Sequence, residues 1–168
     1  LCTEVLRALD RHGLDPDALT LEVTESGCLE DLEAASAALQ MVRDHGVSIS
    51  IDDFGTGYSS LAYLHKLPAS TLKIDRSFVT RLSEDPHTLH VVRAIMRVAH
   101  SLDMQVVAEG IETMDQLEHL RALDCDFGQG YLYAKPIAAD LVDALLDASQ
   151  SLDERSIAAP RDKDHSAS

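Results

Sequence analysis

Apolar residues recur along this chain with two different periods. Helical spacing, with an apolar residue every third or fourth position, covers residues 1–12, 31–45, 87–102, 114–123 and 136–146. Shorter apolar or alternating segments, typical of strands, cover residues 19–24, 48–51, 71–74, 105–109 and 126–131. Strands and helices therefore alternate, which predicts an α/β fold made of βα units around a parallel sheet.

Two of the predicted helices have well-marked apolar faces that we expect to pack on the sheet. The helix at residues 31–45 presents Leu32, Ala35, Leu39 and Val42, and it is followed by Gly46, a typical helix stop. The helix at residues 87–102 presents Val91, Ile95, Val98 and Ala99. One helical turn is also expected at residues 61–65, ahead of Pro68.

The number of units leaves two architectures open, an open doubly wound sheet or part of a (β/α)₈ barrel. About five βα units are predicted, whereas a closed barrel has eight and typically about 250 residues. Polar side chains within strands or at their carboxyl ends favour a barrel-like domain, because barrel enzymes carry their catalytic groups there. These residues are Glu22, Asp52, Asp53, Lys73, Glu109 and Gln129. The prediction is an incomplete barrel of about five βα units.

Composition and charge narrow the function further. The 168 residues are 45% hydrophobic and 26% charged, as in one ordinary globular domain, which we place at residues 1–148 ahead of a disordered polar tail at 149–168. The net charge of −15 argues against a DNA or RNA polymer as partner. A phosphate ester could bind so acidic a protein only if cations lay between the two.

Location and redox state follow from simpler features. No run of 18 apolar residues and no secretory signal is found in the sequence, so a cytoplasmic location is expected, although the parent protein could still be tethered to a membrane. Cys2, Cys28 and Cys125 are an odd number of thiols without metal-ligand spacing, and we expect them to be reduced.

The adjacent acids Asp52 and Asp53 are the sharpest chemical signal. They follow a strand and precede a glycine-spaced polar loop at residues 55–60. Two neighbouring carboxylates repel each other unless a cation or proton lies between them. Solvated acids at a helix N-cap are the simple alternative. Acids or amides at nearly every other strand end make a shared metal site the better interpretation.

The ligand types indicate which metal this site would hold. Oxygen donors without cysteine or paired histidine suit Mg²⁺ or Mn²⁺, and Asp52 and Asp53 are placed to hold two such ions. Two ions can bind a phosphodiester and activate a water between them. Other motifs fit poorly: the glycine loop lacks a dinucleotide or P-loop pattern, and His87 and His90 lie on a helix.

Five ordered motifs resemble those of the EAL-type cyclic di-GMP phosphodiesterase domain. They are LEVTE at 21–25, DDFGTGYSSL at 52–61, LKID at 72–75, VAEGIET at 107–113 and QGYLYAKP at 129–136. The resemblance covers residues 1–148. It implies a modified (β/α)₈ barrel that hydrolyses cyclic di-GMP to linear pGpG in bacterial second-messenger signalling, with Mg²⁺ or Mn²⁺, as a homodimer.

The resemblance also implies a role for individual residues. Glu22 and Asp52 would bind the first ion, and Asp52, Asp53 and Glu109 would surround the second. Lys73 would hold the attacking water or the scissile phosphate, and Glu109 would act as general base. Glu112 and Gln129 would support the metal and water network, with Gln129 and Pro136 at the substrate. Glu25 would anchor the glycine loop that links metal binding to dimerisation.

Two family features are expected ahead of Leu1, namely the Glu-Ala-Leu glutamate and a strand-end asparagine. The chain is thus interpreted as the C-terminal part of an EAL domain, which is expected to hydrolyse nothing measurable by itself. An upstream sensor or cyclase domain is a further expectation. The alternative function is a non-catalytic cyclic di-GMP receptor or protein-interaction module derived from an EAL domain.

Overall fold

The computed structural model describes residues 1–29, 31–55, 61–139 and 141–142. The chain divides into two compact units, Leu1–Ala134 and Lys135–Ser168. All the strands of the described residues belong to the first unit. The predicted tail at residues 149–168 lies outside the described residues.

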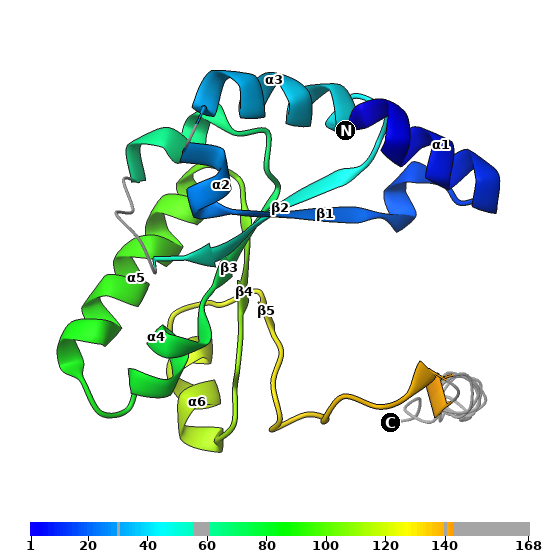
Figure 1. Ribbon diagram of the computed structural model, residues 1–168. Helices are drawn as coiled ribbons and strands as arrows, with labels where there is room; N and C mark the ends of the chain where they lie inside the picture. Colours follow the sequence, from blue (N-terminus) through cyan, green and yellow to red (C-terminus); the bar gives the residue numbers. More distant parts are fainter. Residues whose placement is uncertain (30, 56–60, 140, 143–168) are drawn as a thin grey trace, which may run out of the picture. The chain divides into compact units, whose positions relative to one another are not determined.

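The sheet has five parallel strands whose order in space follows their order in the sequence (Figure 1). They are β1 (Thr20–Thr24), β2 (Ser48–Phe54), β3 (Thr71–Ile74), β4 (Gln105–Ala108) and β5 (Phe127–Gly128). A doubly wound sheet reverses its strand order at a switch point, whereas a barrel winds in one direction. The order β1-β2-β3-β4-β5 therefore decides between the two predicted architectures in favour of a barrel-like arrangement of five βα units.

Helices and 3₁₀ turns fill the connections between the strands. They are α1 (Cys2–His12), η1 (Pro16–Ala18), α2 (Glu25–Leu29), α3 (Leu32–Arg43), η2 (Leu61–Lys66), α4 (Arg76–Arg81), α5 (Pro86–Ser101) and α6 (Met114–Ala122). Local signals explain several of the ends. The Asp31 carboxylate accepts the Ala34 N–H at 3.0 Å and begins α3, and a capping box of Thr113 and Gln116 begins α6.

Three expectations from the sequence need correction. The strand predicted at residues 48–51 extends to Phe54, so Asp52 and Asp53 lie within β2 rather than after it. The predicted face of α5 is wrong at Val91, which is 46% exposed, because Val92 is buried in its place; Ile95 and Ala99 are buried as predicted. A helix turns about 100° per residue, so a shift of one position moves a side chain off the core face.

The third correction concerns the helix predicted at residues 136–146. Residues 136–138 are not helical, whereas Ala139, Leu141 and Val142 are helical as predicted, so the correction applies to the start of the helix; residues 140 and 143–146 lie outside the described part. The short helices α2 and α4 were not predicted. Five or six residues are too few to show a helical period.

The core lies against one face of the central strands. The cross-strand register aligns Ile51 of β2 with Leu72 of β3, and Leu72 with Val106 of β4. All three are 0% exposed. Helix α5 packs on β4 and supplies Val92 and Ala99 to the same core. Alternating apolar positions thus build a helix-covered face, as parallel sheets require.

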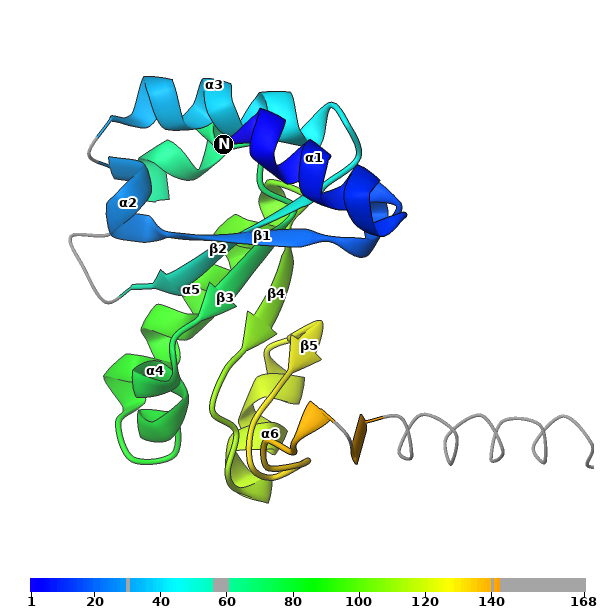
Figure 2. The same cartoon turned by 45° about the vertical axis from the view of Figure 1, so that its right-hand side comes forward.

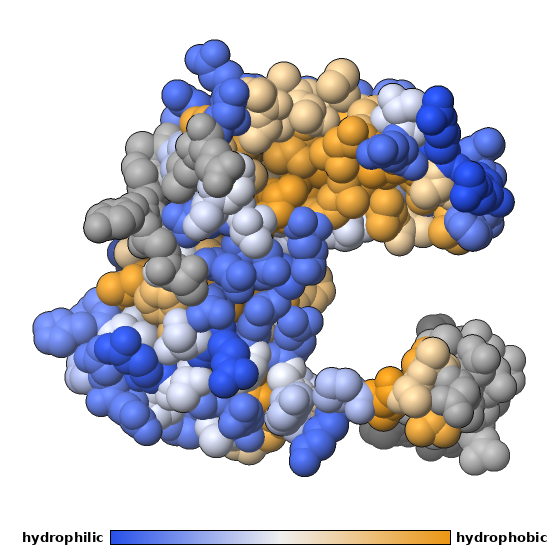
Figure 3. Space-filling view, viewed as in Figure 1, coloured by the Kyte–Doolittle hydropathy of each residue, from blue (hydrophilic) through white to orange (hydrophobic). Residues whose placement is uncertain are grey.

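Hydrophobic surface gathers around α1, α3 and β1 on the face seen in Figure 3. Leu6 of α1 and Leu21 and Val23 of β1 are half-buried and pack against the core. The strand β1 is at the edge of the sheet. No helix within the described residues has the length and apolar character needed to cross a membrane.

Candidate metal centre

Lys73 is the centre of a charged cluster on the other face of the sheet. In β3, its neighbours Leu72 and Ile74 point into the core, so the strand alternation turns Lys73 the opposite way. Its ammonium nitrogen lies 2.8 Å from Glu22 Oε1, 3.1 Å from Asp52 Oδ1 and 2.7 Å from Glu109 Oε1.

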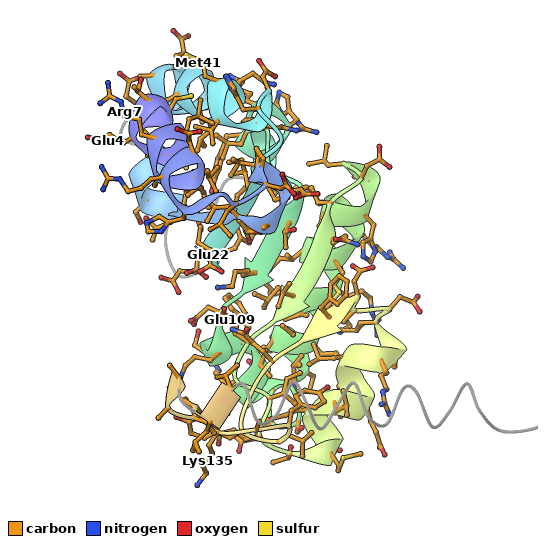
Figure 4. The ribbon with its side chains drawn as sticks, turned by 90° about the vertical axis from the view of Figure 1, so that its right-hand side faces the viewer. Glu4, Arg7, Glu22, Met41, Glu109 and Lys135 are labelled. Atoms are coloured by element: carbon orange, nitrogen blue, oxygen red, sulfur yellow. The ribbon has the colours of Figure 1, made fainter. Side chains whose placement is uncertain are left out.

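The three carboxylates reach Lys73 from different parts of the sheet. Glu22 is in β1, Asp52 in β2, and Glu109 directly follows β4. Figure 4, turned 90° from Figure 1, shows Glu22 and Glu109 on the same side of the sheet. Figure 2 shows the strands β1 to β4, which carry or precede these residues, as neighbours in the sheet. The structure therefore brings Glu22, Asp52 and Glu109 together around Lys73, as the sequence predicted.

The environment keeps Lys73 charged although only 8% of it is exposed. Burial alone would lower the pKa of Lys73, because it disfavours the ammonium form. Hydrogen bonds to Glu109, Glu22 and Asp52 outweigh burial, so the pKa lies above its ordinary value. Three carboxylates therefore surround this one ammonium as ion-pair partners.

A bulge in β2 allows both adjacent aspartates to serve this site. Neighbouring side chains of a regular strand point to opposite faces. The register shifts between Ile51 and Phe54, and Asp53 has a φ of 53°. Such irregularities re-aim side chains and are common beside functional sites. Asp52, Asp53 and Glu109 can consequently offer oxygen atoms that lie within 4.8 Å of one another.

This set of oxygens fits the predicted metal. The donors are carboxylates only, as Mg²⁺ and Mn²⁺ prefer. Three anionic groups at this spacing repel one another, and a divalent cation between them would relieve that repulsion. Glu22 is not in the three-carboxylate group, but it shares Lys73 with Asp52. The fit is therefore clearest for Asp52, Asp53 and Glu109.

Gln129 fixes the orientation of Glu109. Its side-chain amide donates to Glu109 Oε1 at 2.8 Å, the same oxygen that binds Lys73. The Gln129 backbone is held by two hydrogen bonds, donating to Ala108 O at 2.9 Å and accepting from Ile111 N–H at 3.0 Å. The amide of Gln129 is therefore positioned by the sheet itself.

Glycine residues make these close approaches possible. A Cβ on Gly130 would lie 2.2 Å from backbone atoms of Ile111. Gly110, directly after Glu109, has a φ of +71°, and a Cβ there would lie 2.6 Å from Arg76 Cβ. Sequence reasoning did not assign a role to either glycine or to Arg76. The available signal was the placement of glycine beside each functional residue.

Glu25 binds the beginning of the glycine loop. The Gly55 N–H donates to Glu25 Oε2 at 3.0 Å, and Glu25 is only 2% exposed. Burial, followed by the charge of Glu25, raises the pKa of the neighbouring Tyr63. Loop residues 56–60 lie outside the described part of the chain. The contact to Gly55 agrees with the anchoring position predicted for Glu25.

Of two other predicted site residues, Glu112 lies just before α6, and Pro136 lies in the other unit. Glu112 is exposed, and its backbone N–H donates to Gln116 Oε1 at 2.8 Å at the start of α6. Within the described residues, its carboxylate makes no hydrogen bond or ion pair with the Lys73 cluster. Pro136 belongs to the Lys135–Ser168 unit, whose placement relative to the first unit is not determined.

Comparison with known proteins gives related sequences and related structures. Residues 1–136 match the family described as the EAL domain. The chain is 48% identical over 140 residues to a "Bifunctional diguanylate cyclase/cyclic di-GMP phosphodiesterase MucR" of Pseudomonas aeruginosa. That match covers 83% of this chain and 20% of the relative, so the chain spans about a fifth of the relative's length.

Solved structures agree with the sequence comparison. The cyclic di-GMP complex of the PaMucR phosphodiesterase is 48% identical, with a TM-score of 0.79, over 82% of this chain and 56% of that chain. A manganese/cyclic di-GMP complex of Klebsiella pneumoniae BlrP1 is 30% identical, with a TM-score of 0.75, over 80% of this chain and 34% of that chain. Sequence match, strand order and structural likeness together show that this chain belongs to the EAL domain family.

Proposed function

We propose that the protein containing this chain hydrolyses cyclic di-GMP to linear pGpG with Mg²⁺ or Mn²⁺. The observation that carries the proposal is the cluster at the strand ends, where Lys73, Asp52, Asp53 and Glu109 face one another. The relatives' names and structures point to the same substrate class. The chain's charge of −15 explains why an anionic diester would need cations to bind.

The metal ligands we propose are Asp52, Asp53 and Glu109 for one ion, and Glu22 with Asp52 for a second. When bound, such ions neutralise phosphate charge and lower the pKa of a coordinated water. The chain's own contribution is to place carboxylates from three strands and to exclude bulk water from the Lys73 side chain. The BlrP1 structure is a manganese/cyclic di-GMP complex, which supports Mn²⁺ as a test ion.

Proton transfer is assigned to Glu109. Its carboxylate would take a proton from the attacking water as the water oxygen bonds to phosphorus. The bond from phosphorus to the ribose 3′ oxygen breaks, that oxygen gains a proton, and the 5′ phosphate remains on linear pGpG. Gln129 and Lys73 both bind Glu109 Oε1, so the base would be fixed in orientation before substrate arrives.

Supporting roles complete the proposal. Lys73 would place positive charge near the phosphate oxygens, and Glu112 would act through the water network around the ions. Gln129 and Pro136 would line the substrate site. Glu25, through Gly55, would transmit the state of the metal site to a homodimer contact. A sensor or cyclase domain elsewhere in the parent is proposed because the MucR name pairs a cyclase with a phosphodiesterase.

The first experiment measures cyclic di-GMP binding to the chain by equilibrium dialysis, with Mn²⁺ or with EDTA. We expect binding only with Mn²⁺, and a loss of at least about tenfold in Asp53→Asn, because a carboxylate ligand would be lost. Asp10→Asn, on the exposed surface of α1, is the matched control and should bind as the unmodified chain does. Metal-independent binding, or equal binding by Asp53→Asn, would contradict the proposed site.

The second experiment tests hydrolysis in the full-length parent protein. Chromatography should show Mn²⁺-dependent pGpG formation that Asp53→Asn reduces by at least about a hundredfold. Binding without any pGpG would instead favour the non-catalytic receptor. The isolated chain remains expected to be inactive, and pGpG formation by it would overturn that expectation.

A further inference from the structure

The Lys73 ammonium is paired with three carboxylates. Its nitrogen lies 2.8 Å from Glu22 Oε1, 3.1 Å from Asp52 Oδ1 and 2.7 Å from Glu109 Oε1. An ammonium carries only three N–H groups and no acceptor. A phosphate oxygen or a water that binds Lys73 therefore competes with these carboxylates.

The same cluster is strongly anionic without Lys73. Glu22, Asp52, Asp53 and Glu109 carry four formal negative charges, and Lys73 contributes one positive charge at their centre. Like charges at this spacing repel, and the repulsion is stronger in a partly buried site than in water. Lys73 therefore holds together side chains that would otherwise separate.

We propose that Lys73 is the internal counter-ion of the metal site, and that it gives up a carboxylate when a divalent cation binds. The proposal deepens the proposed function, since the cation is the one inferred there. A divalent ion at Asp52 and Glu109 would stand close to the Lys73 ammonium. Two cations repel each other there, so ion binding and the full set of three Lys73 contacts oppose each other.

Exposure and bonding identify the carboxylate that is released. The Glu22 side chain is 51% exposed, against 23% for Asp52 and 18% for Glu109. Water can replace Lys73 around an exposed carboxylate with little loss. Glu109 is additionally bound by Gln129. Glu22 is therefore the partner that Lys73 exchanges, which frees one N–H for an incoming phosphate oxygen.

The test compares Lys73→Met with Lys66→Met. Methionine keeps most of the side-chain length, and Lys66 is an exposed residue whose replacement changes net charge equally. In EDTA, Lys73→Met should unfold at least about 5 °C below Lys66→Met, because three carboxylates lose their counter-ion. Equal unfolding temperatures would contradict the counter-ion role, and this arm needs no metal.

Metal affinity gives the second readout, by titration calorimetry with Mn²⁺. Removing the competing cation should tighten Mn²⁺ binding by Lys73→Met at least about tenfold relative to Lys66→Met. Equal or weaker binding would overturn the exchange. If neither variant nor the unmodified chain binds Mn²⁺, the proposed metal site is wrong, and the proposed release of a carboxylate by Lys73 is wrong with it. The unfolding temperatures in EDTA would still decide whether Lys73 is the counter-ion of the cluster.

A measurement on the unmodified protein covers the case in which Lys73→Met does not fold. A ¹H–¹⁵N correlation spectrum of the lysine ammonium groups should show one slowly exchanging signal in EDTA, because Lys73 is buried and paired with three carboxylates. Adding Mg²⁺ should shift that signal and speed its exchange as Glu22 is released. A signal that Mg²⁺ saturation leaves unchanged would contradict the proposal.

Discussion

The two faces of the central strands are stabilised in different ways. On one face, Ile51, Leu72 and Val106 are 0% exposed and lie beside one another in register. On the other face, Lys73 joins Glu22 and Glu109 by ion pairs. The apolar face depends on burial of area, which any well-packed aliphatic side chain supplies. The polar face depends on a balance between the positive charge of Lys73 and the negative charges of the carboxylates around it, so removing one group changes the stability of the rest.

The difference shows how one sheet can be both rigid and reactive. A packed apolar face resists rearrangement because its contacts are many and non-directional. A charged cluster can exchange partners when a cation or an anion arrives, while the backbone beneath it stays in place. The strands that present Lys73 and Asp52 are the same strands that bury Leu72 and Ile51. Packing on one side therefore pre-organises chemistry on the other.

The largest effect is expected from the apolar face. Leu72→Ala should lower the free energy of unfolding by about 3 kcal/mol, because it leaves a cavity in the core. Val91→Ala, on the exposed side of α5, should change it by less than about 0.5 kcal/mol. Urea denaturation measures both. A large loss in Val91→Ala would restore the originally predicted face of α5.

A second effect tests the tight backbone beside Glu109. Gly110→Ala should cost about 2 kcal/mol or more, since the new Cβ would meet Arg76 Cβ at 2.6 Å and φ is +71°. Gly13→Ala has a similar φ of +63° and open space around it, so it should cost only about 1 kcal/mol. The difference between the two, again by urea denaturation, isolates the steric part. Equal losses would show that Arg76 simply moves aside.

A third prediction concerns the buried acid that holds the loop. Glu25→Ala should lower the free energy of unfolding by about 2 kcal/mol, because the partly buried Gly55 N–H loses its acceptor and a buried side chain is removed. Glu118→Ala, on the exposed side of α6, provides the control and should be nearly neutral. Thermal unfolding measured by circular dichroism is sufficient. If both variants unfold at the same temperature, Glu25 does not hold the loop.

The smallest expected effect depends on pH and concerns Asp126, whose carboxylate binds the backbone of β4. Asp126 Oδ2 accepts the Val106 N–H at 2.8 Å and contacts His100 Nε2 at 2.9 Å. Burial would raise the pKa of Asp126, but Val106 and His100 outweigh it and hold the pKa below its ordinary value. The folded chain therefore binds this proton less readily than the unfolded chain.

The sign of the pH effect follows directly. The contribution of Asp126 is present above its unfolded pKa, about 4, and is lost as pH falls through the lower folded pKa. Asp126→Asn should cost about 1 kcal/mol at pH 7 and progressively less below about pH 4. Urea denaturation at several pH values measures this. A difference that stays constant down to pH 2 would exclude ionisation as its origin.

Sequence patterns were sufficient for the parts of the fold that depend on neighbouring residues. The start of α3 at Asp31 was readable from the sequence because it uses a local hydrogen bond, from the Ala34 N–H to the Asp31 side chain. The face of α5 was misplaced at Val91, because several neighbouring positions are apolar and only the sheet decides between them. The alternation of elements was sufficient to predict a parallel sheet, whereas the strand order that distinguishes a barrel from a doubly wound sheet came from the structure.

The sequence predicted which residues form the candidate site better than it predicted how their side chains are arranged. Acids at strand ends indicated that Glu22, Asp52 and Glu109 would converge. The β2 bulge at Asp53 and the three-way binding of Lys73 depend on register and distance, which no spacing in the sequence encodes. Glu112 was grouped with the site on resemblance, and its role stays a prediction; the structure shows that its backbone N–H donates to Gln116 Oε1 at the start of α6.

The central claim is that the carboxylates around Lys73 form a divalent-metal site. Anomalous diffraction from crystals grown with Mn²⁺ tests it most directly. The expected result is an anomalous peak bonded to Asp52, Asp53 and Glu109, with Glu22 moved away from Lys73. A map without such a peak at saturating Mn²⁺, with all three Lys73 ion pairs intact, would contradict the claim.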